Sequence, residues 1–126
     1  MARLQALFAC CLLAVPSCAL AIGAALGAGA VHTSSEDSAQ LLTRSNAEDT
    51  FAACESTLER LGAVDSADPK RLVLDGTVSE SKLTVQIVPS GRDRHRVTVS
   101  ARRLSGLSPD LETARRVAGE IAELLE

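Results

Sequence analysis

The sequence predicts an α+β domain of two layers, with two helices packed on one face of an antiparallel sheet of three to four strands. Three observations support this fold class. Two segments place apolar residues at helical spacing, and three segments between them alternate apolar and polar residues, as strands with one buried face do. The connections between those strands have hairpin lengths, which makes neighbouring strands antiparallel. The predicted order of elements is β-α-β-β-β-α.

A short strand over residues 39–43 is expected to precede the first helix. Ser45 is the predicted N-cap of this helix, because Glu48 follows it at the spacing of a capping box. Gly62 suits the C′ position that ends the helix, and Asp68-Pro69 predicts a loop before the next strand. The apolar stripe of the helix comprises four residues: Phe51, Cys54, Leu58 and Leu61.

The three alternating strands form a meander whose register follows from burial. Their predicted inward-facing residues are Leu72, Leu74, Val78, Leu83, Val85, Ile87, Val97, Val99 and Ala101. Two loops of hairpin length join them: residues 79–82 and residues 89–93. The expected pairing places Val78 opposite Leu83, and in the next pair it places Val85 opposite Val97. On the outer face this register predicts two rows: Thr77, Thr84 and Thr98, and Asp75, Gln86 and Arg96.

Ser108-Pro109 predicts the start of the second helix, with serine as the N-cap and proline at the first helical position. The apolar stripe of this helix comprises Leu111, Ala114, Val117, Ile121 and Leu124. Each helix therefore has one apolar face, and we expect both faces to pack on the apolar side of the sheet.

The N-terminus resembles a bacterial lipoprotein signal peptide over residues 1–17. Arg3 supplies the positive n-region, and residues 4–15 form an apolar h-region. Val15-Pro16-Ser17-Cys18 then has an aliphatic residue at −3 and a small residue at −1 before the cysteine, as in lipoprotein signals. Cys18 is therefore the predicted lipidation site, since its sulfur would carry the diacylglycerol.

Three other interpretations of this segment stay open. Ala19-Leu20-Ala21 fits an ordinary signal peptidase site, which would release a non-lipidated periplasmic protein. Residues 4–31 are long enough for a retained membrane anchor, although Ala and Gly make them weakly apolar. In the third interpretation, the cysteines of this segment are apolar filler.

Under the lipoprotein interpretation the chain has three parts. The signal peptide spans residues 1–17, and Cys18 begins a Gly/Ala-rich and then polar tether over residues 18–38. A single small α+β domain follows over residues 39–126. Because Ala19 rather than aspartate follows the cysteine, the usual sorting rule favours the outer membrane. The expected location is the bacterial cell envelope, with the lipid-anchored domain facing the periplasm.

Composition disfavours several classes of function. The chain of 126 residues has a formal net charge of −3, which argues against a nucleic-acid-binding protein. Phe51 is the only aromatic residue after the signal, so the domain lacks the platforms that stack on bases or sugars. The sequence has no Cys/His spacing typical of a metal site, and no nucleotide-binding or hydrolase motif. We therefore expect no cofactor, no metal and no enzymatic activity.

Cys54 is the only cysteine after Cys18, so the domain cannot form an intramolecular disulfide. Its position on the apolar stripe of the first helix predicts a small buried hydrophobic residue rather than a reactive thiol. His95 shares the parity of the apolar residues of its strand and is expected at the rim of the core.

Five arginines lie close together in the second half of the meander: Arg92, Arg94, Arg96, Arg102 and Arg103. They are the candidate anion-binding residues, because the guanidinium group binds phosphate and carboxylate bidentately. The register places Arg94, Arg96 and Arg102 on the face away from the helices. Lipid phosphates or cell-wall carboxylates would be the ligands. The alternative is an ordinary solvated sheet face without a ligand.

The chain also resembles the family of small, functionally uncharacterised bacterial lipoproteins in which a Gly/Ala-rich stretch follows the lipobox. These continue with a strand, a helix of pattern A-x-x-x-L-x-x-L-G, three strands and a C-terminal helix. The matching stretches are residues 23–27, 54–62, 74–76, 83–88 and 114–117. The chain departs from the pattern by having Cys54 in place of alanine, and Arg102-Arg103-Leu104 where a glycine-containing turn is expected. The resemblance implies this fold and a lipid anchor, and it brings no catalytic residues.

These features predict a membrane-anchored envelope lipoprotein that acts as a structural or protein-interaction module. Its partners would be the membrane, through the lipid anchor, and a protein of the envelope. The alternative function is an anionic-ligand-binding or lipid-binding domain that uses the arginine-rich face.

Overall fold

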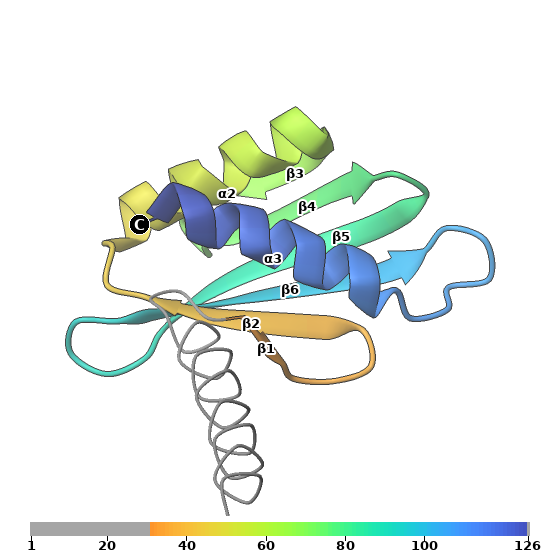
Figure 1. Cartoon of the computed structure of the whole chain (residues 1–126). Helices are drawn as coiled ribbons and strands as arrows, with labels where there is room; N and C mark the ends of the chain where they lie inside the picture. Colours follow the sequence, from red (N-terminus) through yellow and green to blue (C-terminus); the bar gives the residue numbers. More distant parts are fainter. Residues whose placement is uncertain (1–30, 126) are drawn as a thin grey trace, which may run out of the picture.

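The computed structural model describes residues 31–125 and confirms the α+β class. These residues form two helices and a sheet of six strands, rather than the three to four strands expected (Figure 1). The elements are β1 (His32–Thr33), β2 (Ser38–Thr43), α2 (Ala47–Leu61), β3 (Gly62–Asp68), β4 (Val73–Val78), β5 (Ser81–Pro89), β6 (His95–Arg103) and α3 (Leu111–Leu125). The two strands that were not expected, β1 and β3, are the edges of the sheet.

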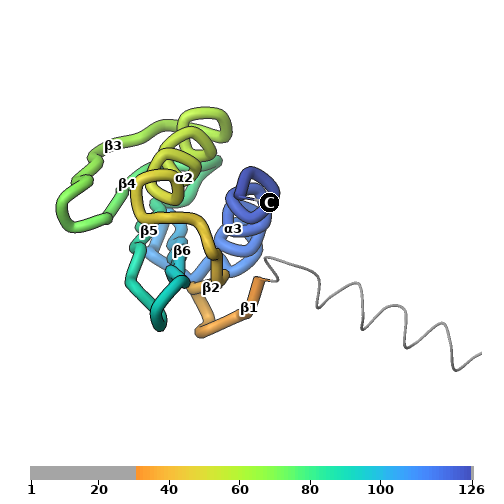
Figure 2. The backbone as a smooth tube through the Cα atoms, turned by 90° about the vertical axis from the view of Figure 1, so that its left-hand side faces the viewer, coloured from red at the N-terminus to blue at the C-terminus, as the bar shows by residue number. Residues whose placement is uncertain are grey.

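The sheet is antiparallel throughout, in the order β1-β2-β6-β5-β4-β3. α2 packs on β3, β4 and β5, and α3 packs on β2 and β6, so the helices lie side by side on one face (Figures 1 and 2). Within residues 31–125 no element covers the opposite face, which we call the open face. The β3–β4 and β5–β6 loops emerge at one end of the sheet. The β1–β2 turn, the β4–β5 turn and the β6–α3 loop emerge at the other.

The residues predicted to face inward from the strands form the core with the helices. Most have no exposed surface at all, among them Leu74, Val78, Leu83, Val85, Val97 and Val99. Leu72 is an exception, because it precedes β4, is half-buried and has a left-handed φ of 57°. In α3 the predicted stripe residue Leu124 is 50% exposed, since the helix buries Ala118 and Ala122 in its place.

Both helices begin one or two residues later than the sequence predicts. Asn46 rather than Ser45 caps α2, and its Oδ1 accepts a hydrogen bond from the Asp49 amide at 2.7 Å. Asp110 rather than Ser108 caps α3, and its Oδ1 accepts from the Thr113 amide at 3.3 Å. In both cases a carbonyl or carboxylate oxygen reaches the amide three residues ahead, which is the geometry that an N-cap requires.

Gly62 does not end α2 in a left-handed C′ conformation but opens β3 with an extended φ of −169°. Glycine is needed here for close approach, because a Cβ atom would lie 2.0 Å from the Thr77 carbonyl oxygen of β4. β3 is exposed along nearly its whole length and contains a bulge between Val64 and Ser66. It therefore lacks the apolar alternation by which a strand is recognised in a sequence.

The register of the meander differs from the expected one by two residues in both pairs. Val78 lies opposite Ser81, and Val85 lies opposite Val99. The β4–β5 pair shifts because its turn is tighter and has only two residues, Ser79 and Glu80, of which Ser79 adopts a φ of 56°. The β5–β6 pair shifts because its five-residue loop lies one residue further along the chain than expected, at residues 90–94. A shift of two keeps every side chain on its predicted face, so burial alone could not distinguish the two registers.

The polar end of the predicted tether contributes to the sheet. His32 and Thr33 pair with Gln40 and Ala39 of β2, and the chain then turns back through residues 34–37. The folded part of the chain therefore includes residues ahead of the predicted domain start at residue 39.

Candidate anion-binding surface

The structure separates the five predicted arginines into two groups at opposite ends of β6. Arg92 and Arg94 are exposed in the β5–β6 loop, and Arg96 follows at the start of β6 on the open face. Arg102 lies six residues further along the strand, which corresponds to ~20 Å. Arg103 is next to it but borders a hollow on the helix side of the sheet. The five side chains therefore do not form one patch.

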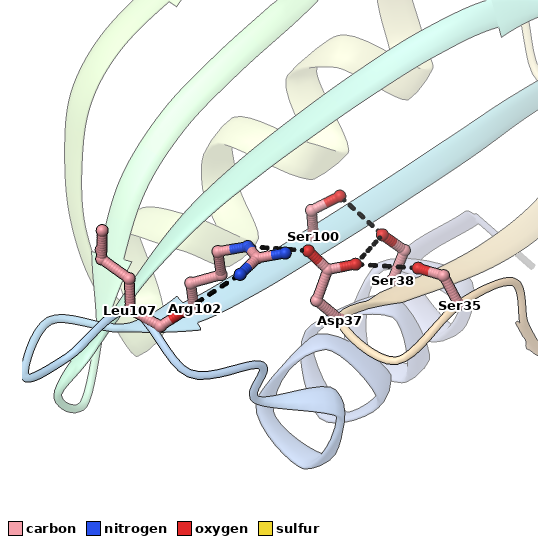
Figure 3. Close-up of polar contacts among 6 residues, drawn as sticks. All are labelled: Ser35, Asp37, Ser38, Ser100, Arg102 and Leu107. Carbon is pink, nitrogen blue, oxygen red and sulfur yellow. Dashed lines mark hydrogen bonds and ion pairs between the residues drawn. The ribbon is translucent and has the colours of Figure 1, made fainter.

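Arg102 joins the β1–β2 turn to the β6–α3 loop (Figure 3). Its Nε donates to Asp37 Oδ2 at 3.0 Å, and its Nη1 donates to the Leu107 carbonyl oxygen at 3.0 Å. Asp37 also accepts hydrogen bonds from Ser35 at 2.8 Å and Ser38 at 3.0 Å. These hydrogen bonds, above all that of Ser35, and the charge of Arg102 hold the pKa of Asp37 below its ordinary value. Arg102 is thus engaged within the fold.

The β3–β4 loop adds two exposed cationic residues that were not among the predicted site residues, Lys70 and Arg71. This loop adjoins β5, because the Ile87 amide donates to the Leu72 carbonyl oxygen at 3.0 Å. Figure 2 looks onto this end of the sheet, with the β3–β4 loop in green and the β5–β6 loop in teal. We define the basic end as the five exposed cationic residues of these two loops and of the start of β6: Lys70, Arg71, Arg92, Arg94 and Arg96.

Positive charge predominates at the basic end. Its five cationic side chains are accompanied by two carboxylates, Asp68 at the end of β3 and Asp93 in the β5–β6 loop. Arg71 Nε lies 3.8 Å from Asp68 Oδ2 with both side chains well exposed, so this ion pair restrains the guanidinium only weakly. The carboxylates of Glu48 and Asp49 belong to the first turn of α2, on the helix side of the sheet. The cationic groups are therefore accessible to an anion that approaches from the loops or the open face.

The open face is lined mainly by short polar side chains that bond to one another. Asp75 accepts hydrogen bonds from Ser66 at 3.1 Å and from Thr84 at 2.9 Å. The expected row that joins Asp75 to Arg96 does not form, because the register shift places Arg96 opposite Val88. The polar side chains at the centre of this face thus hydrogen-bond to one another, and the accessible positive charge lies at the basic end.

A polar hollow of about 460 Å³ lies at the other end of the sheet, beside the start of α3. Within it Asp110 accepts hydrogen bonds from the hydroxyl groups of Ser81 and Thr113. These bonds, that of Ser81 foremost, hold the pKa of Asp110 below its ordinary value. Because the carboxylate already caps α3 and binds both hydroxyl groups, its role in the hollow is structural.

Cys54 and His95 occupy the positions expected of them. Cys54 is fully buried, as its place on the apolar stripe predicts, and this burial raises the pKa of the thiol to about 12. His95 is half-buried at the edge of the core, and its Nδ1 lies 3.1 Å from the Ser45 carbonyl oxygen.

Cys18, the predicted lipidation site, lies outside the residues that the structure describes. Among the helices of residues 31–125, none is long and apolar enough to cross a membrane. The same residues contain no group of three or more His, Cys, Asp or Glu side chains placed to hold a metal ion.

The chain matches no protein-family model, and no curated protein shows significant similarity to it. Its resemblance to the small envelope lipoproteins therefore stays a prediction from the N-terminal pattern and the matching stretches of the domain.

Proposed function

We propose that this protein is a bacterial envelope lipoprotein, anchored through Cys18, that acts as an interaction module and binds an anionic partner at its basic end. One observation carries the proposal: two loops distant in the sequence place exposed lysine and arginine residues at the same end of the sheet. Guanidinium groups suit carboxylate and phosphate, which they bind bidentately. The proposal requires no cofactor and no enzymatic step.

The favoured partner is a macromolecule that carries several carboxylates. An exposed ion pair contributes about 0.2–1 kcal/mol, so a small anion that meets one or two arginines gains little. The five side chains of the basic end are spread over two loops and a strand, where a polyanion can meet several of them together. Cell-wall carboxylates or an acidic face of an envelope protein have this chemistry, and lipid phosphates are the alternative source.

Charge reversal within the β5–β6 loop tests this proposal. The full chain with R92E and R94E is expected to bind poly-glutamate beads at least about tenfold more weakly, since each reversal replaces an attraction by a repulsion. The matched control is K82E with R115E, which changes the net charge equally at exposed positions outside the basic end. Vesicles that contain phosphatidylglycerol, assayed in parallel, distinguish lipid phosphate from carboxylate as the ligand.

The control variant is expected to bind as the wild type does. An equal loss in both variants would show that binding follows the net charge of the chain rather than the basic end. Unchanged binding of the R92E/R94E variant would contradict the proposal directly.

A further inference from the structure

The β6–α3 loop lies at the end of the sheet opposite the basic end (Figure 1). It contains two large apolar side chains that are exposed. Leu104 is 56% exposed and Leu107 is 61% exposed. Single exposed leucines are common on protein surfaces. Two on one short loop, directly after Arg102 and Arg103, form a small apolar tip with cationic residues at its base.

Hydrogen bonds hold this loop in a shape that keeps the leucines outside. Leu107 has a left-handed φ of 56°, a conformation that is costly for a leucine, and Gly106 beside it has a φ of 83°. The Arg102 guanidinium donates to the Leu107 carbonyl oxygen at 3.0 Å, and the Leu104 amide donates to the Glu80 carbonyl oxygen at 2.9 Å. The loop therefore holds both leucine side chains exposed to solvent rather than packed over the core.

The apolar tip is too small to support a stable protein interface by itself. Two leucines of this exposure offer on the order of 100 Å² of apolar surface. Specific protein interfaces bury about 1,200–2,000 Å². A bilayer sets no such requirement for a protein that is already tethered to it, because the tether makes insertion an intramolecular event with a high effective concentration.

The residues around the tip also suit a bilayer surface. Arg103 is exposed beside Leu104 and can reach lipid phosphates while its stem lies against the apolar region. The carboxylate of Glu80, on the adjoining β4–β5 turn, offsets part of this charge. The contact is therefore expected to depend on the leucines more than on lipid charge or salt concentration.

We propose that Leu104 and Leu107 insert into the surface of the bilayer to which the protein is anchored, so that the basic end points away from the membrane. This inference rests on the proposed anchor at Cys18. Thirteen residues lead from Cys18 to Val31 and reach at most about 45 Å when extended. The nine residues of β6 span ~30 Å, so the tether is long enough for this orientation.

The chain contains no tryptophan or tyrosine, so one introduced tryptophan reports its own surroundings. We would isolate full-length Leu107→Trp from bacterial membranes, reconstitute it in phosphatidylethanolamine vesicles and measure quenching by brominated acyl chains. The matched control is Leu124→Trp, which is 50% exposed near the end of α3. Emission of Leu107→Trp is expected to shift to shorter wavelength and to be quenched, at low and at high salt. The control is expected to stay unquenched.

A second pair of variants measures the contribution of one leucine. Leu104→Trp is expected to be quenched in the same way, and the added Leu107→Ser change is expected to lower the ratio of inserted to free loop by about tenfold. Circular dichroism of each variant shows that the fold is retained.

The possible results separate this inference from the proposed function. If the protein floats with the vesicles but Leu107→Trp is not quenched, the inference is wrong and the anchor stands. A shift to shorter wavelength without quenching would place the loop against protein, such as a second copy, and would overturn the inference as well. If the protein does not float with the vesicles, the anchor and the inference that rests on it both fail.

Discussion

Replacement of Asp110 by alanine is expected to lower the free energy of unfolding by about 2–3 kcal/mol. Loss of the N-cap of α3 costs about 0.5–2 kcal/mol. The Ser81 hydroxyl, on a residue only 1% exposed, also loses its acceptor, and an unsatisfied buried polar group costs about 1–3 kcal/mol. Because Ser81 borders the polar hollow, water can replace part of the hydrogen bond that Ser81 loses. The expected loss of stability therefore lies in the lower half of the range that the two costs span together.

The contribution of Asp110 should depend on pH with a definite sign. Hydrogen bonds from Ser81 and Thr113 hold its pKa in the folded state below the value in the unfolded chain. Its stabilising effect is therefore present above the unfolded pKa and is lost as the pH falls through the folded pKa. The stability difference between wild type and Asp110→Asn is expected to be complete at pH 7 and to shrink below about pH 4.

Urea unfolding followed by far-ultraviolet circular dichroism measures both effects. Asp110→Asn keeps an acceptor oxygen and is expected to lose about half as much as Asp110→Ala. The control is Asp93→Ala in the exposed β5–β6 loop, which should stay within about 0.5 kcal/mol of the wild type. An equally small effect of Asp110→Ala would refute the structural role assigned to this carboxylate.

Three further predictions concern glycine, cysteine and arginine. Gly62→Ala is expected to lower the free energy of unfolding by about 2 kcal/mol or more, because its Cβ atom would meet the backbone of β4. Gly119→Ala in α3 meets open space and is expected to raise the free energy of unfolding by about 0.5–1 kcal/mol. Denaturant unfolding compares the two variants. Cys54 should resist a thiol reagent at pH 8 until the protein is unfolded, since it is buried and its pKa is raised to about 12, and rapid labelling of the native protein would contradict this. Arg102→Ala is expected to speed amide hydrogen exchange around Asp37 and to leave poly-glutamate binding unchanged; weakened binding would place Arg102 in the anion site after all.

The sequence predicted the centre of the sheet well, because burial leaves a pattern there. The strands β4, β5 and β6 alternate between a buried and an exposed face, and residues such as Leu83 and Val97 point into the core as expected. The edge strands leave no such pattern. β3 is exposed nearly throughout, and β1 is only two residues long within a polar stretch, so neither alternates.

The candidate site was predicted only in part, because it combines residues from two loops that are distant in the sequence. Arg92, Arg94 and Arg96 are close in the sequence, and their proximity could be read from it. Lys70 and Arg71 form a visible basic pair just ahead of β4, and the antiparallel pairing of β4 with β5 places them at the same end of the sheet as the β5–β6 loop. The expected meander therefore contained a signal for these two residues that was not used. Arg102 and Arg103 have separate roles because their side chains leave β6 on opposite faces. Arg102 forms an ion pair with Asp37 of the β1–β2 turn, whereas Arg103 borders the polar hollow. Their spacing in the sequence does not reveal these partners.

Lipidation of Cys18 is the central claim of the proposed function, and labelling of growing cells with palmitate tests it most directly. Cells that produce the full chain are compared with cells that produce Cys18→Ser, and a Cys10→Ser/Cys11→Ser variant controls for loss of other cysteines from the same segment. We predict label on the wild type and on the control, and none on Cys18→Ser. Label that persists on Cys18→Ser, or its absence from the wild type, would contradict a lipid anchor at this cysteine.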